Sequence, residues 1–203
     1  MPTQRVRRPP QEARLLILQA AEELLIEGGP HAVQLRAVAE RVGITDAGVA
    51  HHFSNRQGLH LALLWHGGRR LRRAVEEAAE SWIDDRASIT DLVDRIAAVY
   101  ADGYGELAIA LHAAGWRDEG VGLLEPVVGL LHAARRRQPG QRLRRHDTQL
   151  AVAALHQALA TEPAYGEAFR RSAGFTGPEA GTTRPQMRWW ANTLSSTLDI
   201  PVT

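Results

Sequence analysis

The sequence of 203 residues predicts an all-α protein. Two observations lead to this prediction. Ala, Leu, Glu and Arg, which favour helices, dominate the chain, and no segment shows the alternating β-branched pattern of a strand. Apolar residues instead recur at the three- and four-residue spacing of amphipathic helices. We expect an N-terminal three-helix domain followed by a larger C-terminal helical bundle.

The first helix is expected over residues 11–27, where one face carries Leu15, Leu18, Ala21, Leu24 and Leu25. The segment Gly28-Gly29-Pro30 should end it, because glycine caps a helix readily and proline cannot continue one.

A second helix is expected over 35–42, and Gly43 is placed to adopt a positive φ at its end. Thr45 is a natural N-cap for a third helix over 46–52. Ser54 and Gln57 fit a capping box, which predicts a fourth helix from 55 to about 80.

Further helices are expected at 88–103, 106–116, 126–137, 147–160, 164–172 and 183–198. The segments 138–146 and 173–182 contain Pro and Gly and are expected to be loops.

The composition excludes several classes of site. The chain has no Cys, which excludes disulfides and thiolate metal sites, and no apolar run reaches the roughly 18 residues of a membrane span. The N-terminal segment has positive charge but lacks the apolar core and cleavage site of a signal peptide. We therefore expect a cytoplasmic protein with no membrane partner and no cofactor.

Residues 35–59, LRAVAERVGITDAGVAHHFSNRQGL, have the layout of a helix-turn-helix, whose second helix lies in the DNA major groove. Residues 11–64 resemble the N-terminal domain of the tetracycline-repressor (TetR) family of bacterial transcription regulators. The resemblance is carried by ARLLILQAAEELLIEGG, by LRAVAERVGIT and by HFSNRQGL. The chain departs from the family in two places: Ala50 replaces a Tyr that commonly touches a phosphate, and Arg56 replaces a Lys.

A helix that enters the major groove needs small or polar side chains at its N-terminal end. Thr45, Asp46, Ala47, Gly48 and His51 meet this requirement. Thr45 could reach a phosphate or a thymine methyl. His51 could contact a base or a phosphate, and the alternative is a solvated surface histidine. Asp46 has two interpretations of equal weight. Its carboxylate could accept a hydrogen bond from cytosine N4, or its charge could simply stabilise the N-terminus of the helix.

Other candidate DNA contacts lie around this helix. By its position in the family, His52 is expected to contact the phosphate backbone or to brace the turn. Arg56 is a candidate phosphate ligand at the start of the fourth helix, and Gln34 and Arg36 are weaker candidates. Residues 1–60 hold 7 Arg and 6 acidic residues, so binding must rest on placed contacts rather than on bulk charge.

The N-terminal arm carries Arg5, Arg7 and Arg8 without an acidic residue. Such an arm could enter a minor groove or follow phosphates, and it could equally be a disordered tail in the free protein.

The resemblance implies a DNA-binding domain over 1–56 and a ligand-binding and dimerisation domain over 57–203. Large aromatic residues and histidines in the bundle suggest an apolar pocket with a few polar groups. The candidate ligand-binding residues are Trp65, His66, Trp82, Tyr100, Tyr104, His112, Trp116, His132 and His156. Each could alternatively be an ordinary core or surface residue, and the histidine spacings match no known metal motif.

The expected helices at 147–160 and 183–198 have small or apolar faces. They are candidates for a four-helix interface between two subunits. The interface residues expected are Leu150, Ala153, Ala154, Gln157, Met187, Trp190 and Leu194. The alternative is that both segments close the core of a single chain. A Pro-Gly loop that is expected to be solvated is flanked by Arg135–Arg137, Arg142, Arg144 and Arg145. The alternative is that these arginines bind an acidic partner.

Together these observations suggest a homodimeric, ligand-responsive repressor that a small-molecule effector releases from a palindromic operator, and not an enzyme. The alternative is a helical small-molecule-binding protein or enzyme in which the helix-turn-helix is only structural.

Overall fold

The computed structural model describes residues 9–85, 88–118, 122–136 and 144–200. Within these ranges the chain is helical and contains no strand, which confirms the all-α prediction. The elements are α1 (Pro10–Gly28), α2 (Leu35–Val42), α3 (Asp46–Phe53), α4 (Arg56–Asp84), α5 (Ile89–Val99), η1 (Tyr100–Tyr104), α6 (Gly105–Ala113), α7 (Glu125–Arg135), α8 (Arg145–Ser172), η2 (Gly177–Gly181) and α9 (Arg184–Leu198). None of the described helices is long and apolar enough to cross a membrane.

The contacts divide the chain into two compact units. The first contains Met1–Arg69 and Ala110–Trp116, and the second contains Arg70–Ile109 and Arg117–Thr203. The boundary falls inside α4 and inside α6, so neither unit is a continuous piece of sequence. This division by contacts differs from the division by function expected at residue 56, which stays a prediction.

In the first unit, α2 packs against both α1 and α3. The buried stripe of α1 runs through Ile17, Ala21 and Leu25, each fully buried. Leu15, expected on this stripe, is instead 45% exposed because it lies to one side of it. Arg41 of α2 links the two helices with a bidentate ion pair to the Glu27 carboxylate of α1, at 2.8 Å for each nitrogen.

The segment 110–116 completes the first unit. The Nε2 atom of His60 lies 2.9 Å from the carbonyl oxygen of Ala114. The indole of Trp116 lies against the backbone of Gly68 in α4, where a Cβ atom would stand only 2.5 Å from its Nε1. Glycine at position 68 therefore permits the close approach of this ring.

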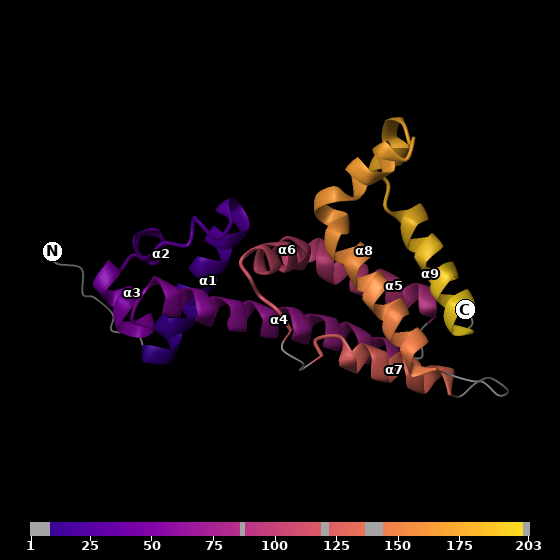
Figure 1. Ribbon diagram of the computed structural model, residues 1–203, viewed down its shortest axis with the longest axis horizontal. Coiled ribbons are helices and arrows are strands. Elements are labelled where there is room, and N and C mark those ends of the chain that lie inside the picture. The colour runs from indigo at the N-terminus through magenta and orange to yellow at the C-terminus, as the bar shows by residue number, and fades with distance from the viewer. Residues whose placement is uncertain (1–8, 86–87, 119–121, 137–143, 201–203) are drawn as a thin grey trace. The chain divides into compact units, whose positions relative to one another are not determined.

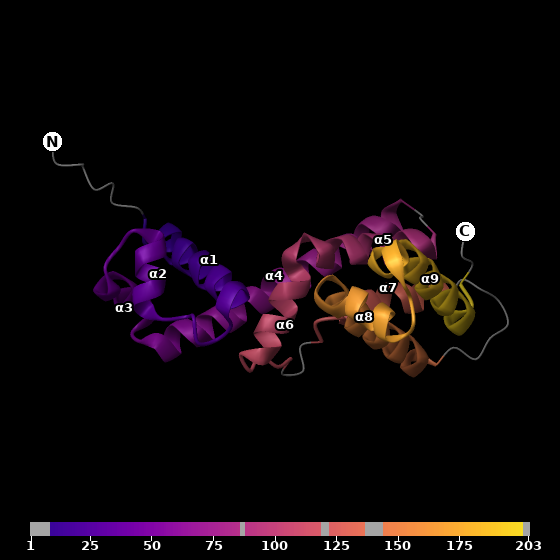
Figure 2. The same ribbon diagram turned by 90° about the horizontal axis from the view of Figure 1, so that it is seen from above.

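In the second unit, α5 packs against α9 and α8, and α7 packs against α8 (Figures 1 and 2). The core between these helices consists of apolar side chains that are almost wholly buried: Leu92, Val93, Ile96, Leu155, Leu159, Met187, Ala191 and Leu194. In Figure 1, α8 and α9 run in opposite directions and η2 joins them.

The sequence correctly predicted two successive helices where the structure has α5 and α6. It did not predict the connection between them. The connection is the π-type turn η1, in which Asp102 (φ −84°, ψ 33°) and Gly103 (φ 88°) leave helical geometry. The first residue of α6, Gly105, lies against α8: a Cβ atom there would be 2.9 Å from Pro163 Cγ and 3.1 Å from the Ala160 carbonyl oxygen.

The expected division of α8 into two helices is wrong. The helix runs from Arg145 to Ser172 and includes Pro163. Beyond it, the expected loop over 173–182 contains a short 3-10 helix, η2, that begins with proline near its N-terminus.

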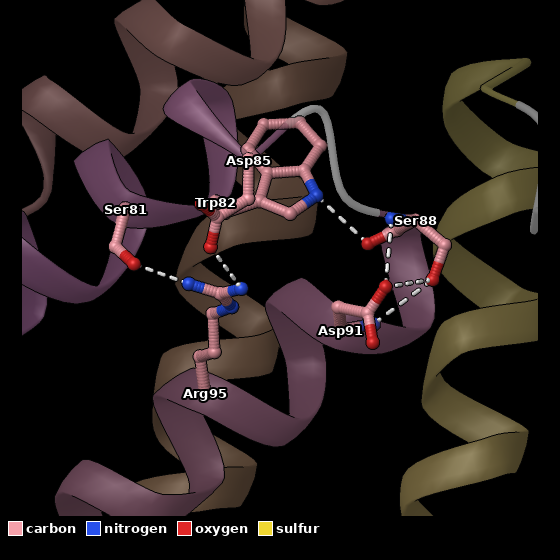
Figure 3. Close-up of polar contacts among 6 residues, drawn as sticks. All are labelled: Ser81, Trp82, Asp85, Ser88, Asp91 and Arg95. Carbon is pink, nitrogen blue, oxygen red and sulfur yellow. Dashed lines mark hydrogen bonds and ion pairs between the residues drawn. The ribbon is translucent and has the colours of Figure 1, made fainter.

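Side-chain hydrogen bonds hold the junction between α4 and α5 (Figure 3). Ser88 and Asp91 form a capping box at the start of α5. The indole Nε1 of Trp82 donates to the Ser88 carbonyl oxygen at 2.7 Å. Arg95 donates to Ser81 Oγ and, at 2.6 Å, to Asp85 Oδ2. These contacts fix the orientation of α5 at its first turns.

Arg135 was expected to flank a solvated loop, and the expectation that it is solvated is wrong. The residue ends α7, is only 3% exposed, and donates hydrogen bonds to Leu198 O, Arg144 O and Thr148 Oγ1 at 2.8–3.2 Å. Buried charge is tolerated when its donors are satisfied in this way. Arg136, Arg144 and Arg145 are exposed, and Arg137 and Arg142 lie outside the described residues.

Candidate DNA interface: the helix-turn-helix

The turn between α2 and α3 depends on Gly43. This residue has φ 75° and ψ 35°, the left-handed conformation that favours glycine. Its N–H donates to the carbonyl oxygens of Ala39 and Glu40, and the N–H of Ile44 donates to Ala39 at 3.0 Å. The last carbonyl groups of α2 are thereby satisfied, and the chain reverses within three residues.

Thr45 is the N-cap of α3, as the sequence predicted. Its hydroxyl accepts a hydrogen bond from the Gly48 N–H at 3.2 Å. Val49 and Phe53 are the buried residues of α3. The opposite side of the helix is available to a partner, because Thr45, Asp46, Ala47 and His51 are exposed and Gly48 is half-buried.

The start of α4 differs from the prediction. The capping box expected from Ser54 and Gln57 is absent from this turn: Ser54 follows α3 with φ 67°, and the side-chain oxygen of Asn55 accepts from the Gly58 N–H at 2.9 Å. Asn55 is thus the N-cap of α4. A Cβ atom at Gly58 would lie 2.1 Å from the Phe53 carbonyl oxygen, so only glycine fits where α4 meets the end of α3.

Arg56 lies at the first position of α4, but its guanidinium points towards the loop between α1 and α2. Its Nε donates to the Val33 carbonyl oxygen at 3.0 Å, and a terminal nitrogen donates to the Pro30 carbonyl oxygen at 3.1 Å. Arg56 therefore holds this loop in the structure, and its expected contact with phosphate stays a prediction.

The two weaker candidates also make local contacts. Arg36 donates to the Glu40 carboxylate at 3.0 Å, and this hydrogen bond raises the pKa of Arg36. The negative charge of Asp46 raises the pKa of Arg36 by a smaller amount. The Gln34 amide donates to the His31 carbonyl oxygen at 2.9 Å. The arm with Arg5, Arg7 and Arg8 lies outside the described residues.

One residue that the sequence did not single out holds the far end of α3. Arg14 of α1 donates to the His52 carbonyl oxygen at 2.7 Å, and its guanidinium carbon lies 4.2 Å from the centre of the Phe53 ring. Asn55 and Gly58 were missed as well. The Asn-x-x-Gly spacing that follows Phe53 is a signal for a capped turn that could have been recognised.

The expected ligand-binding residues are divided between the two units. Trp65, His66, His112 and Trp116 belong to the first unit and the other five to the second. Trp65 is 56% exposed, and Trp82 is a core residue. In the second unit the Tyr100 hydroxyl is hydrogen-bonded to His156 Nδ1, and burial raises the pKa of Tyr100.

The other two expected ligand-binding residues of the second unit, His132 and Tyr104, have polar or charged neighbours. His132 Nδ1 lies 3.2 Å from Thr148 Oγ1, and the guanidinium of Arg70 lies over the Tyr104 ring at 5.5 Å from its centre. Burial lowers the pKa of His132, and nearby arginines lower it further. The ligand-binding role of the whole set stays a prediction.

Two of the expected dimer residues must be corrected. Met187 and Leu194 are 7% and 1% exposed, because this face of α9 packs inside the chain against α5 and α8. Leu150, Ala153, Ala154 and Gln157 are exposed on α8, and Trp190 is half-buried.

Further exposed apolar side chains are Tyr165 and Phe169 on α8, Phe175 between α8 and η2, and Trp189 on α9. An apolar groove of about 530 Å³ lies in this region, lined by Arg170, Phe175, Glu179, Thr182, Pro185, Gln186 and Trp189.

Comparison with known proteins agrees with this geometry. A protein of Mycobacterium tuberculosis named as an HTH-type transcriptional repressor is 36% identical over 108 residues, or 51% of this chain and 52% of that protein. The HTH-type transcriptional activator FasR of Mycolicibacterium smegmatis is 31% identical over 88 residues, or 43% of this chain and 40% of that protein. The chain therefore spans about half the length or less of these relatives.

The fold extends beyond the matched segment. The crystal structure of the fatty acid degradation regulator FadR from Bacillus halodurans superposes with a TM-score of 0.55, covering 91% of this chain and 96% of that one at 14% identity. At this identity the likeness concerns the fold alone. Residues 17–63 match the family described as bacterial regulatory proteins, tetR family. This matched segment includes α2, the turn at Gly43 and α3, so the similarity to the tetR family falls on the helix-turn-helix.

Proposed function

We propose that this chain is a dimeric transcriptional regulator, not an enzyme, and that it binds a palindromic DNA operator in the bacterial cytoplasm through α3. The observation that carries the proposal is the exposed N-terminal side of α3. Thr45, Ala47 and Gly48 leave the helix backbone close to the surface, and His51 extends from the next turn. A helix of this kind can approach base edges in the major groove.

The proposed contacts follow from the position of each side chain. The Thr45 hydroxyl already accepts from Gly48 N–H, so its hydrogen remains available to a phosphate oxygen. His51 has room to donate to a base or a phosphate. His52 is half-buried at the end of α3 and is the more suitable of the two histidines for bracing the turn. Gln34, Arg36 and Arg56 would reach the DNA backbone only by releasing their present partners.

A second copy of the chain is the partner that we propose for the outer face of α8 and α9. Exposed aromatic and aliphatic side chains gather there, although exposed apolar patches are costly for a monomer. Ala153 and Ala154 would allow two copies of α8 to approach closely. A dimer would also place two α3 helices on successive major grooves, which lie roughly 34–36 Å apart.

We propose further that a small-molecule effector binds in the second unit and releases the protein from its operator. The support is chemical: the second unit combines an apolar helical interior with the hydrogen-bonded pair Tyr100 and His156. One related protein is named as a repressor and another as an activator. We favour repression because effector release from an operator needs nothing more than a difference in affinity between two states of the chain.

The test is DNA binding by the full chain. A labelled duplex from the region flanking the gene is titrated with the wild type, with His51→Ala and with Thr45→Val. Arg73→Gln is the control, because Arg73 is an exposed arginine of α4 paired with Glu77 at 3.1 Å. We expect both α3 variants to bind at least about tenfold more weakly while the control binds normally. Equal binding by all four proteins would remove α3 from the interface, and no sequence preference by the wild type would favour a purely structural helix-turn-helix.

The effector is tested separately. A thermal-shift screen of small apolar and aromatic compounds on the full chain identifies binders, because a ligand that binds the folded state raises its melting temperature. Binders are then added to the protein–DNA complex. Release of the DNA supports the repressor; tighter binding would point to a co-repressor or activator.

A further inference from the structure

The C-terminal end of α3 is held from the side by Arg14, a residue of the second turn of α1. One terminal nitrogen of its guanidinium donates to the His52 carbonyl oxygen at 2.7 Å. The carbonyl groups in the last turn of a helix have no partner within the helix, so this bond satisfies one of them. The positive charge also lies at the negative end of the α3 dipole.

The same guanidinium stacks on Phe53. Its central carbon lies 4.2 Å from the centre of the ring, which is within the range of a cation–π contact. Phe53 is 5% exposed, so the ring is fixed by the core on its other side. Arg14 therefore contacts α3 at two neighbouring residues, through one hydrogen bond and one cation–π contact.

The arginines of α2 and of the first turn of α4 make different contacts. Arg36 pairs with Glu40, Arg41 pairs with Glu23 and Glu27, and Arg56 binds two carbonyl oxygens of the loop before α2. Among the described contacts, Arg14 is the arginine that joins α1 directly to α3.

From this geometry we propose that Arg14 is a positioning residue for DNA recognition: it clamps the end of α3 to α1 and so fixes the angle at which α3 meets the bases. The proposal rests on the proposed function. Base recognition requires side chains to be held within fractions of an ångström, and the exposed His51 ring is in edge contact with the ring of His52, whose carbonyl group is clamped. Loss of the clamp reduces discrimination between sequences more than it reduces attraction to DNA.

A direct contact between Arg14 and a phosphate is the competing explanation, and salt dependence separates the two. Each phosphate contact contributes about 0.9 to the slope of log binding constant against log salt concentration. A clamp contributes nothing to this slope, because its guanidinium binds a carbonyl oxygen and an aromatic ring of the protein and not a phosphate.

The experiment uses the full chain and two duplexes: one enriched from a random pool by the wild-type protein, and one of the same composition in scrambled order. Dissociation constants are measured by fluorescence anisotropy at several salt concentrations for the wild type, Arg14→Lys, Arg14→Gln and the control Arg73→Gln. Thermal unfolding of each protein shows that it is folded.

For Arg14→Gln we expect the ratio of affinities for the selected and scrambled duplexes to fall by about tenfold, with the salt slope on scrambled DNA unchanged. Arg14→Lys keeps the charge but cannot lie flat on the ring, so its ratio should also fall, by a smaller factor. A slope reduced by about 0.9 in Arg14→Gln, with wild-type behaviour in Arg14→Lys, would overturn the clamp in favour of a phosphate contact.

A double-mutant cycle tests the path through Phe53. In a Phe53→Leu background, Arg14→Gln should have a smaller effect on the affinity ratio than in the wild type, because the stacking surface is already lost. If Arg14→Gln changes the affinity ratio by the same factor in both backgrounds, the clamp is refuted. If the wild type enriches no sequence, the proposed function and the clamp fail together; if it does and the Arg14 variants match the control, the clamp alone fails.

Discussion

The carbonyl oxygen of Phe53 occupies the place where residue 58 would otherwise carry a side chain: a Cβ atom on Gly58 would lie 2.1 Å from it. This contact joins the end of α3 to the start of α4 through backbone atoms, which cannot move without changing the turn. We expect Gly58→Ala to lower the free energy of unfolding by about 1–3 kcal/mol, as overpacking does, and to abolish DNA binding.

Urea unfolding of the full chain measures this effect. Gly129→Ala is the matched control, because it also lies in a helix and a Cβ atom there would meet nothing within 4 Å. The control should be neutral or slightly stabilising. Equal stability of the two variants would show that the turn relaxes without cost.

Gly48 presents the opposite case. A Cβ atom at this position of α3 would meet only Thr45 Oγ1 at 3.5 Å and Ile44 at 3.6 Å, which are ordinary contacts. Because glycine inside a helix is less stable than alanine, Gly48→Ala should raise the free energy of unfolding by about 0.5–1 kcal/mol. The added methyl group should nevertheless weaken DNA binding if α3 lies in the major groove. Unfolding and duplex titration of one protein sample give both values, and tighter binding would place Gly48 away from the DNA.

The neighbouring residues Arg135 and Arg136 provide a comparison between a buried and an exposed guanidinium. Arg135→Met removes the donors to Leu198 O, Arg144 O and Thr148 Oγ1. We expect Arg135→Met to lower the free energy of unfolding by about 3 kcal/mol, because buried carbonyl groups lose their hydrogen-bond donors. Arg136→Met should change stability by less than about 0.5 kcal/mol. Denaturant unfolding would contradict this account if the two variants were alike.

The capping box of α5 predicts a pH dependence. Hydrogen bonds from the Ser88 hydroxyl and then from its N–H lower the pKa of Asp91 below its ordinary value of 3.8. The carboxylate therefore stabilises the folded state above pH 3.8, and this contribution is lost as the pH falls through the lower pKa of the folded state.

Asp91→Asn should accordingly be less stable than the wild type at pH 7, and the difference should shrink as the solution is acidified below pH 3.8. Unfolding curves at a series of pH values measure the difference. Asp94→Asn, an exposed carboxylate of α5 outside the capping box, is the control. A difference that stays constant across the series would rule out the carboxylate as its source.

The proposed dimer face on α8 and the buried face of α9 predict two distinct phenotypes. Leu150 is 57% exposed, so Leu150→Glu should leave the monomer folded while disrupting the proposed dimer. Leu194 is 1% exposed, and Leu194→Ala should instead lower the free energy of unfolding by about 2–5 kcal/mol. Sedimentation and circular dichroism distinguish these outcomes. A dimeric Leu150→Glu protein would exclude this part of α8 from the interface.

The sequence predicted the helix-turn-helix well because its signals are local. Gly43 ends α2 and Thr45 caps α3, and each interaction spans only three or four residues. The capping of α4 was predicted at the wrong residue, because Ser54 and Asn55 are both good caps. The choice between them depends on the positive φ of Ser54, which the sequence does not reveal.

Contacts between distant residues could not be predicted in this way. Arg14 meets α3 across 38 residues, and Arg135 meets Leu198 across 63. Nothing in the local pattern distinguishes Arg135 from Arg136. Similarly, the apolar face of α9 fits both a dimer interface and a monomer core, and only the packing of α5 against Met187 and Leu194 decides between them.

The segment 110–116 has a consequence for the order in which the protein folds during synthesis. Ala114 and Trp116 supply contacts to His60 and Gly68 in a unit whose remaining residues have already left the ribosome. Domains generally fold as units as the chain emerges, N-terminal part first. This unit must wait for about forty residues of its neighbour before its last partners arrive. Until then the α4 surface at Gly68 lacks the indole of Trp116 that later covers it.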